Sequence, residues 1–362
     1  MAHYCLPILC FISALLGGFL AEKVGIPLAW VLGPLVVTAV FSISGTKPFA
    51  PLSGRRLGQL IIGCAIGLNV TPALAASVTG LIPAMVISAF VAMLVGASIA
   101  IGLAHFSRVD TKTAYYCMMP GGLSEMANVG AEYGAQHEPI AVSQAIRVAL
   151  VVCLLPPLMV GLDWHGSFSG QLSAHVLTID RIPFVVFIAL IGVLVLYHLR
   201  LNNPWMVGSL IGVGIASGFG LFDGRLSREI FFAGQFLLGI SIGSRFRRDA
   251  ILALGTFTLA SGFCTIIITT LLFGYGILLS NVTKLDIASA ILSVSPGGFA
   301  EMAVTAELLS LNIAAVTAFH VVRASLVNSL TTHYYNLLFR IGFFSAGHAL
   351  LRKFFKQSHA GK

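Results

Sequence analysis

The chain carries the same pattern twice, at one fixed spacing. The stretch MMPGGLSEMA at residues 118–127 recurs as VSPGGFAEMA at residues 294–303. Arg147 recurs as Arg323 at the same offset of 176 residues, and no gap is needed between the motif and the arginine. A single offset that holds across half the chain is a far stronger signal than any one motif. It predicts two tandem homologous repeats.

The repeats lie in a chain with too few charges for a soluble domain. Of its 362 residues, 57% are hydrophobic and only 9% are charged, whereas soluble domains carry about 25% charged residues. A membrane helix needs roughly 20 mainly apolar residues, and the segments 81–106, 139–161 and 251–279 meet or approach this length. The sequence therefore predicts an all-α, polytopic membrane protein whose first partner is the lipid bilayer.

Each half contains six apolar elements, which gives about 10–12 membrane segments in total. We expect a first membrane repeat at 1–161, a polar connection at 162–181, a second membrane repeat at 182–346 and a basic tail at 347–362. Internal duplication on this scale is a hallmark of secondary transporters, which sit as multi-pass proteins in the inner (plasma) membrane.

We expect the two repeats to be inverted relative to one another. If one element of each half does not cross the membrane, each half crosses an odd number of times and the second repeat is turned over. The positive-inside rule favours neither arrangement when all loop lysines and arginines are counted. The densest basic cluster, RFRRD at 245–249, lies inside only in the inverted arrangement.

The fifth element of each half is interrupted by Pro-Gly-Gly. A broken helix at membrane depth is tolerated only where it lines a cavity or is buried in protein. After the break, Ser124-Glu125 and Ala300-Glu301 open a second half-helix. The first turn of a helix has free N–H groups and a partial positive charge, so it stabilises an acid and attracts anionic groups.

We predict a binding site for a small, anionic or polar solute between the two breaks. A charge at the bilayer centre costs at least about 2.5 kcal/mol, so the acid and the arginine present in both halves need compensation. In one interpretation the acids bind a proton or sodium ion and the arginines bind a substrate carboxylate or balance the acids. In the other, each Glu pairs with its Arg and only holds crossing helices together. The predicted site comprises Glu125, Glu301, Arg147, Arg323, Gly121, Gly122, Gly297, Gly298, Ser124, Gln59 and Gln235.

The two glutamines belong to a third element that reads GQLIIGCAIG at 58–67 and GQFLLGISIG at 234–243. Small residues four apart let helix backbones approach closely in lipid. We therefore expect close helix packing here first. For Gln59 and Gln235 we expect hydrogen bonds between helices first and contact with a solute second.

No motif indicates a metal, a cofactor or a catalytic group. The ten histidines are scattered without an H-x-H or H-E-x-x-H pattern, and the six cysteines form no C-x-x-C pair. Copper and iron sites need clustered imidazole or carboxylate ligands. The net charge of +8 is explained by basic cytoplasmic loops, so we expect no direct contact with nucleic acid. Because no catalytic or metal-binding motif is present, we also expect no enzymatic activity.

The repeated PGG[LF]xEMA, the arginine that follows it, the GQxxxGxxxG element and the stretch GIPLAWVLGPL resemble the AbrB-type duplicated membrane proteins. The resemblance extends from about residue 6 to 340. That family is labelled both as an ammonia monooxygenase and as a regulator of gene expression. Its fold is placed with cation/proton antiporters and bile-acid symporters, which use inverted repeats and paired discontinuous helices. This chain lacks the adjacent Asp-Asp or Asn-Asp pair of the antiporters.

The resemblance and the residues together favour a secondary transporter, with a proton or a sodium ion as the candidate coupling ion. The alternative is a membrane protein that influences gene expression through a partner or a transported metabolite. Metal-dependent oxygenation is the least favoured function. The sequence is compatible with either a monomer or a homo-oligomer.

Overall fold

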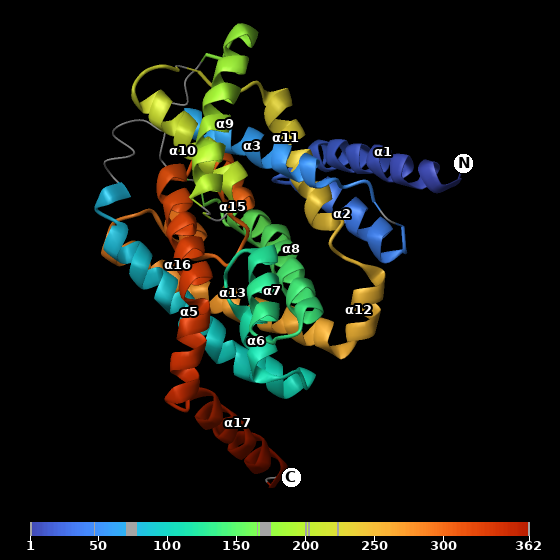
Figure 1. The fold of residues 1–362 in the computed structure, drawn as a ribbon, viewed down its shortest axis with the longest axis vertical. Helices are drawn as coiled ribbons and strands as arrows, with labels where there is room; N and C mark the ends of the chain where they lie inside the picture. The colour runs from blue at the N-terminus through green and yellow to red at the C-terminus, as the bar shows by residue number, and fades with distance from the viewer. Residues whose placement is uncertain are drawn as a thin grey trace.

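The computed structural model describes residues 2–46, 48–69, 78–164, 166, 175–199, 201, 203–222 and 224–360. Over these ranges the regular elements are all helices (Figure 1), and one isolated bridge joins Val176 and Arg225. Six of the helices are long and apolar enough to cross a membrane. The predicted class, an all-α polytopic membrane protein, is confirmed.

The helices of the two halves follow one another in matching order. The first half holds α1 (Ala2–Lys23), α2 (Ala29–Ile43), α3 (Leu52–Leu68), α5 (Ile82–Ser107), α6 (Thr111–Met118), α7 (Leu123–Glu132) and α8 (His137–Gly161). The second half holds η1 (Ile179–Arg181), α9 (Ile182–His198), α10 (Pro204–Gly218), α11 (Arg228–Gly243), α12 (Arg248–Leu254), α13 (Thr256–Thr283), α14 (Ile287–Val294), α15 (Phe299–Leu308), α16 (Ile313–Arg340) and α17 (Phe343–Ala360).

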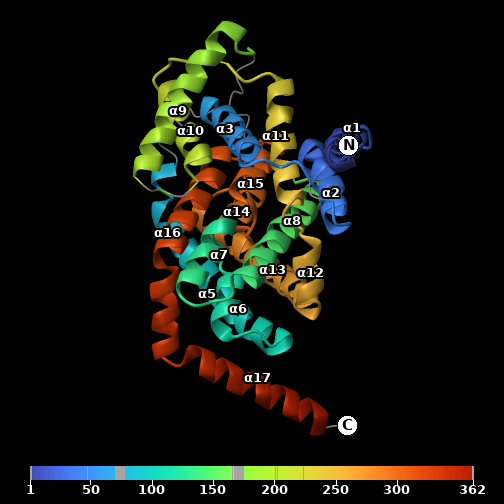
Figure 2. The same cartoon turned by 45° about the vertical axis from the view of Figure 1, so that its right-hand side comes forward.

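The predicted connection is described only in part, whereas the predicted basic tail is almost entirely helical. Within the predicted connection 162–181, residues 165 and 167–174 lie outside the described residues. The predicted basic tail lies in α17, which begins at Phe343. The start of α17 packs against α5, and its C-terminal end projects away from the rest of the chain (Figures 1 and 2).

Within the described ranges, the helices both long and apolar enough to span a membrane are α1, α5, α8, α13 and α16, together with η1–α9. Helices α2, α3, α10 and α11 are continuous but shorter, and the fifth element of each half is divided by its Pro-Gly-Gly break.

The two halves are interleaved rather than placed side by side. Helix α2 packs against α11, and their counterparts α10 and α3 pack against one another in turn. In the same way α5 packs against α16, and α13 packs against α8. Such an exchange of counterparts is what a two-fold relation between the halves would produce.

Glycines allow the closest of these contacts. A Cβ atom placed on Gly239 of α11 would lie 2.5 Å from the carbonyl oxygen of Val31 in α2. A Cβ on Gly67 of α3 would lie 2.8 Å from the carbonyl oxygen of Leu210 in α10. Real side chains do not reach such distances, so the four-residue glycine spacing serves close helix packing.

The helices form two groups. One contains α1, α2, α3, α9, α10 and α11, and the other contains α5 to α8 and α13 to α16. Figure 2 shows the short helices α14 and α15 where the two groups meet. The largest buried cluster joins residues of both groups, among them Leu32 and Leu238 from the first and Val152 and Ala303 from the second. Both broken helices belong to the second group.

Candidate functional site

Each Pro-Gly-Gly motif separates two short helices. Helix α6 ends at Met118 and α7 begins at Leu123, while α14 ends at Val294 and α15 begins at Phe299. The second glycine of each motif, Gly122 or Gly298, is the N-cap residue of the following helix and has an extended backbone. The break therefore leaves unpaired carbonyl groups on one side and unpaired N–H groups on the other.

A buried arginine satisfies the carbonyl side of the first break. Arg147 projects from α8 and is 2% exposed. Its guanidinium donates hydrogen bonds to the carbonyl oxygen of Met119 and, over 3.0 Å, to that of Gly121. Gln144, one turn earlier, donates to the carbonyl oxygens of Tyr116 and Met119. These side chains replace the hydrogen bonds that a continuous helix would have made.

The second break is held in the same way by Arg323 of α16. Its guanidinium donates to the carbonyl oxygens of Ser295 and, over 3.3 Å, Gly297. It also forms a hydrogen bond of 2.9 Å with Nδ1 of His320. Since an arginine can only donate, Nδ1 is the acceptor of this bond. His320 Nε2 therefore carries the proton, and it donates to the carbonyl oxygen of Leu292 over 3.0 Å. His320 thus does for α14 what Gln144 does for α6.

The two acids lie on the N–H side of the breaks. Glu125 and Glu301 occupy the third position of α7 and α15, and each carboxylate folds back over the start of its own helix. A Cβ atom on Gly122 would collide with the Glu125 carboxylate, and one on Gly298 would collide with that of Glu301. The second glycine of each motif thus leaves room for the carboxylate of the acid three residues later, the spacing found in a capping box.

Among the described residues no ion pair joins Glu125 to Arg147 or Glu301 to Arg323. The arginines have a structural role, but their partners are backbone carbonyls rather than the acids. Of the two interpretations of the sequence, direct Glu–Arg pairing receives no support from these contacts. The carboxylates are left facing a cavity.

One cavity of about 130 Å³ reaches both breaks. Nine of the eleven predicted site residues line it, and these nine are Gln59, Gly121, Gly122, Glu125, Arg147, Gly297, Gly298, Glu301 and Arg323. Ser124 does not line it. Gln235 lies in a different cavity, beside Glu307. The cavity therefore combines equivalent residues of both repeats.

Several lining residues were not predicted from the sequence, among them Arg55, Arg245 and Asn328. Arg55 of α3 and Arg245, in the turn after α11, add two cationic groups to the cavity. Burial, and then the charge of Arg55, lower the pKa of Arg245 to about 10, while Glu125 and Glu301 act in the opposite direction. Arg245 is therefore still protonated at neutral pH. Asn328 of α16 also lines the cavity, and both polar atoms of its side-chain amide are buried with no partner among the described residues.

The cavity has an excess of positive charge. Four arginines and two glutamates line it, and the N-terminal ends of α7 and α15 add partial positive charges. Among the described residues no group of three His, Cys, Asp or Glu side chains could hold a metal ion. The arrangement can bind an anion through guanidinium and backbone N–H groups.

Known proteins match this chain over most of its length. Residues 50–339 match the family described as "Transition state regulatory protein AbrB". The chain is 26% identical over 347 residues to the Bacillus subtilis (strain 168) protein described as "Uncharacterized protein YhjN", covering 89% of this chain and 90% of that protein. It is also 26% identical over 327 residues to the Escherichia coli (strain K12) protein described as "Putative regulator AbrB", covering 87% of this chain and 91% of that one. The chain thus belongs to the AbrB family.

Proposed function

We propose that the chain is a secondary transporter of a small anionic solute, and that the solute binds in the cavity between the two broken helices. The observation that carries this proposal is the shared lining. Equivalent residues of both halves, Glu125 with Glu301 and Arg147 with Arg323, face one cavity. Transporters with internal repeats bind substrate at the repeat interface beside discontinuous helices, whose N-termini face anionic groups.

The charges of the cavity favour an anion over a cation or a neutral solute. Arg147 and Arg323 are held by backbone carbonyls, so their positive charge is not cancelled by an acid. Arg55 and Arg245 add a second pair of cations from the other helix group. The volume of about 130 Å³ is below the roughly 300 Å³ at which drug-sized sites begin. A solute with one or two carboxylate or oxyanion groups suits this space.

Glu125 and Glu301 are the candidates for binding a coupling ion. Their carboxylates line the same cavity and form no ion pair with the neighbouring buried arginines among the described residues. A proton or a sodium ion on either acid would increase the attraction of the cavity for an anion. Symport of the anion with that cation, across the inner membrane, follows from this linkage.

The regulator descriptions of the family and of the Escherichia coli relative suggest a second role. Under our proposal an effect on gene expression is indirect and passes through the level of the transported anion. A variant that folds but does not transport would then lose the effect. A regulatory effect that survives in such a variant would favour a partner protein instead.

The test uses full-length protein in liposomes. Thermal-shift screening with phosphate, sulfate, acetate and succinate selects an anion, whose uptake is then measured with a radiolabel. Arg245→Gln is expected to weaken anion binding about tenfold, because a charge-assisted hydrogen bond is lost. The matched control is Arg247→Gln. It removes an equal charge from an exposed position two residues further along the chain. The proposal is overturned if no anion binds or if Arg245→Gln binds and transports like the control.

A further inference from the structure

A second cavity, of about 460 Å³, lies apart from the first. It is enclosed by the turn between α1 and α2, the start of α11, the C-terminal end of α15 and the end of α8. The two cavities share no lining residue. The polar side chains of this second cavity are Glu22, Trp30, Arg228, Gln235 and Glu307.

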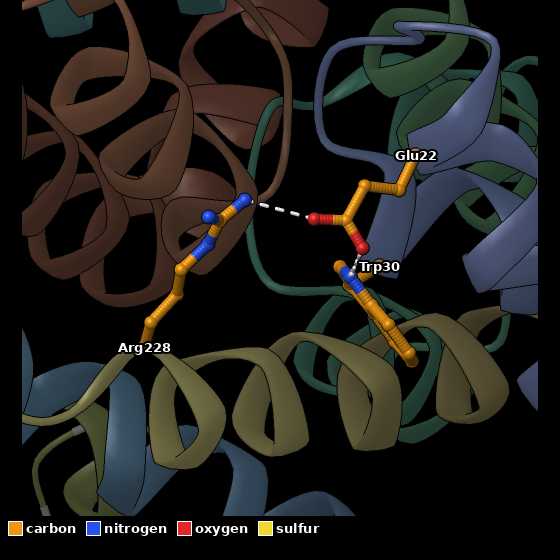
Figure 3. Close-up of polar contacts among 3 residues, drawn as sticks. All are labelled: Glu22, Trp30 and Arg228. Atoms are coloured by element: carbon orange, nitrogen blue, oxygen red, sulfur yellow. Dashed lines mark hydrogen bonds and ion pairs between the residues drawn. The ribbon is translucent and has the colours of Figure 1, made fainter.

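One of its two acids is fully engaged. Glu22 accepts a hydrogen bond of 2.8 Å from Arg228 and one of 2.9 Å from the indole nitrogen of Trp30 (Figure 3). Phe232 lies between these partners, with the Trp30 ring stacked at 5.4 Å and the Arg228 guanidinium 4.8 Å from its centre. This group forms one wall of the cavity and leaves no spare charge on Glu22.

The other acid has no such partner. Glu307 stands in the last turn of α15, and its Oε2 atom is buried with no hydrogen-bond partner among the described residues. Arg225, which is exposed, acts on it electrostatically without forming an ion pair among these residues. The carbonyl end of a helix is itself partially negative. An isolated carboxylate in this position is costly, and a proton or a bound cation relieves that cost.

Gln235 adds a second unused polar group to the lining of the same cavity. Its side chain is 5% exposed and forms no hydrogen bond with the described residues. It therefore offers an amide oxygen to a donor in the cavity. At the equivalent positions of the first repeat, Gln59 lies in the other cavity and Ala131 replaces Glu307. The pairing of an acid with this glutamine is thus particular to the second repeat.

We infer that this second cavity binds an alkylammonium cation, with its N–H groups on Glu307 and Gln235 and its carbon chain against Leu28, Phe231 and Leu309. The inference does not depend on the transport of an anion by the first cavity. A ligand with a positive head and an apolar body matches a pocket that is mostly apolar with few polar groups. Hard metal ions such as Ca²⁺ and Mg²⁺ take about six oxygen ligands, more than these two side chains provide. The ammonium group can come from a free amine or from the headgroup of an ethanolamine lipid.

Binding is tested on purified full-length protein with hexylammonium, and with hexanol as a neutral probe of the same length. Hexylammonium is expected to raise the thermal unfolding temperature saturably, while hexanol does not. In Glu307→Gln the affinity for hexylammonium is expected to fall at least about tenfold, because a charged hydrogen bond becomes a neutral one. The control is Glu132→Gln, which changes an exposed acid in the last turn of the corresponding helix α7. This control should bind hexylammonium like the wild type.

A second variant keeps the test decisive if Glu307→Gln does not fold. Leu308→Trp changes a half-exposed residue of the lining and fills the cavity, and it is expected to abolish hexylammonium binding. Mass spectrometry of protein extracted from membranes distinguishes the lipid source, since a bound ethanolamine lipid should be lost in either variant. The inference is overturned if hexanol stabilises as well as hexylammonium, if sodium chloride gives the same shift, or if binding persists in both variants.

Discussion

Arg147 donates a hydrogen bond of 3.0 Å to the carbonyl oxygen of Gly121, which lies in the break between the end of α6 and the start of α7. The equivalent Arg323 makes the same contact with Gly297 at 3.3 Å. A buried cation on the next long helix therefore takes the place of the missing helical N–H groups. The breaks are fixed structures with a defined partner, and the four predictions below follow from that geometry and from the cavity beside it.

Replacing Arg147 with Ala should destabilise the fold by about 2–5 kcal/mol, because buried carbonyl groups at the break lose their donor. Thermal unfolding of purified protein in detergent measures the effect. Arg147→Lys should recover only part of the stability, since one ammonium group cannot reproduce the forked contact with Met119 and Gly121. Full stability of Arg147→Ala would show that the arginine does not hold the break.

Gly122→Ala and Gly298→Ala should each reduce solute binding, because the new methyl group displaces the carboxylate three residues later. The carboxylate can move aside, so stability should fall by only about 0.5–1.5 kcal/mol. Gly102→Ala is the matched control, since a Cβ atom there meets nothing within 4 Å. This control should be neutral or stabilising by up to about 1 kcal/mol, as alanine is the better helix former. If Glu125→Ala is combined with Gly122→Ala, the collision disappears and the two effects should not add.

Asn328→Leu should separate stability from binding. Both polar atoms of the Asn328 amide are buried without a partner among the described residues, so an apolar side chain of similar size should raise stability by about 1 kcal/mol. The same change should weaken solute binding, because the free amide faces the first cavity. Unfolding temperature and anion affinity are measured on one preparation. A variant that binds normally would remove Asn328 from the site.

Glu301→Gln should uncouple the transporter. The carboxylate lines the first cavity and makes no ion pair among the described residues, so we expect exchange of the anion to continue while the dependence on a sodium or proton gradient is lost. Glu138→Gln, at the exposed start of α8, serves as the control. Uptake into liposomes with imposed gradients measures both activities. An unchanged gradient dependence in Glu301→Gln and Glu125→Gln would place the coupling ion elsewhere.

Much of this arrangement could be predicted because the duplication marks it. An offset of 176 residues identified the paired breaks, the acids that follow them and the arginines of the next helices, and these groups do line one cavity. Apolar length alone predicted the fold class, since backbone groups in lipid must be paired within helices. The glycine spacing of α3 and α11 likewise predicted close helix contacts.

Other features of the site could not be predicted from the sequence. The partners of Arg147 and Arg323 are backbone carbonyls, which every residue has, so the pattern suggested the nearby acids instead. Arg245 and Asn328 have no equivalent in the first repeat, where Asn69 and Val152 stand, and a search based on symmetry cannot find them. Gln235 matches Gln59 in sequence, but it lies in the other cavity because the surroundings of α3 and α11 differ.

The packing of helices of one half against helices of the other affects how the protein folds during its synthesis. Helix α2 packs on α11 and α3 packs on α10, so neither early helix meets its partner until the second half has been synthesised. At about 5–20 residues per second, the ribosome takes roughly 10–40 s to extend the chain from α2 to α11. During that time lipid or the insertion machinery must cover the faces of α2 and α3 that later contact α11 and α10. The two halves therefore mature together, after synthesis, rather than one after the other.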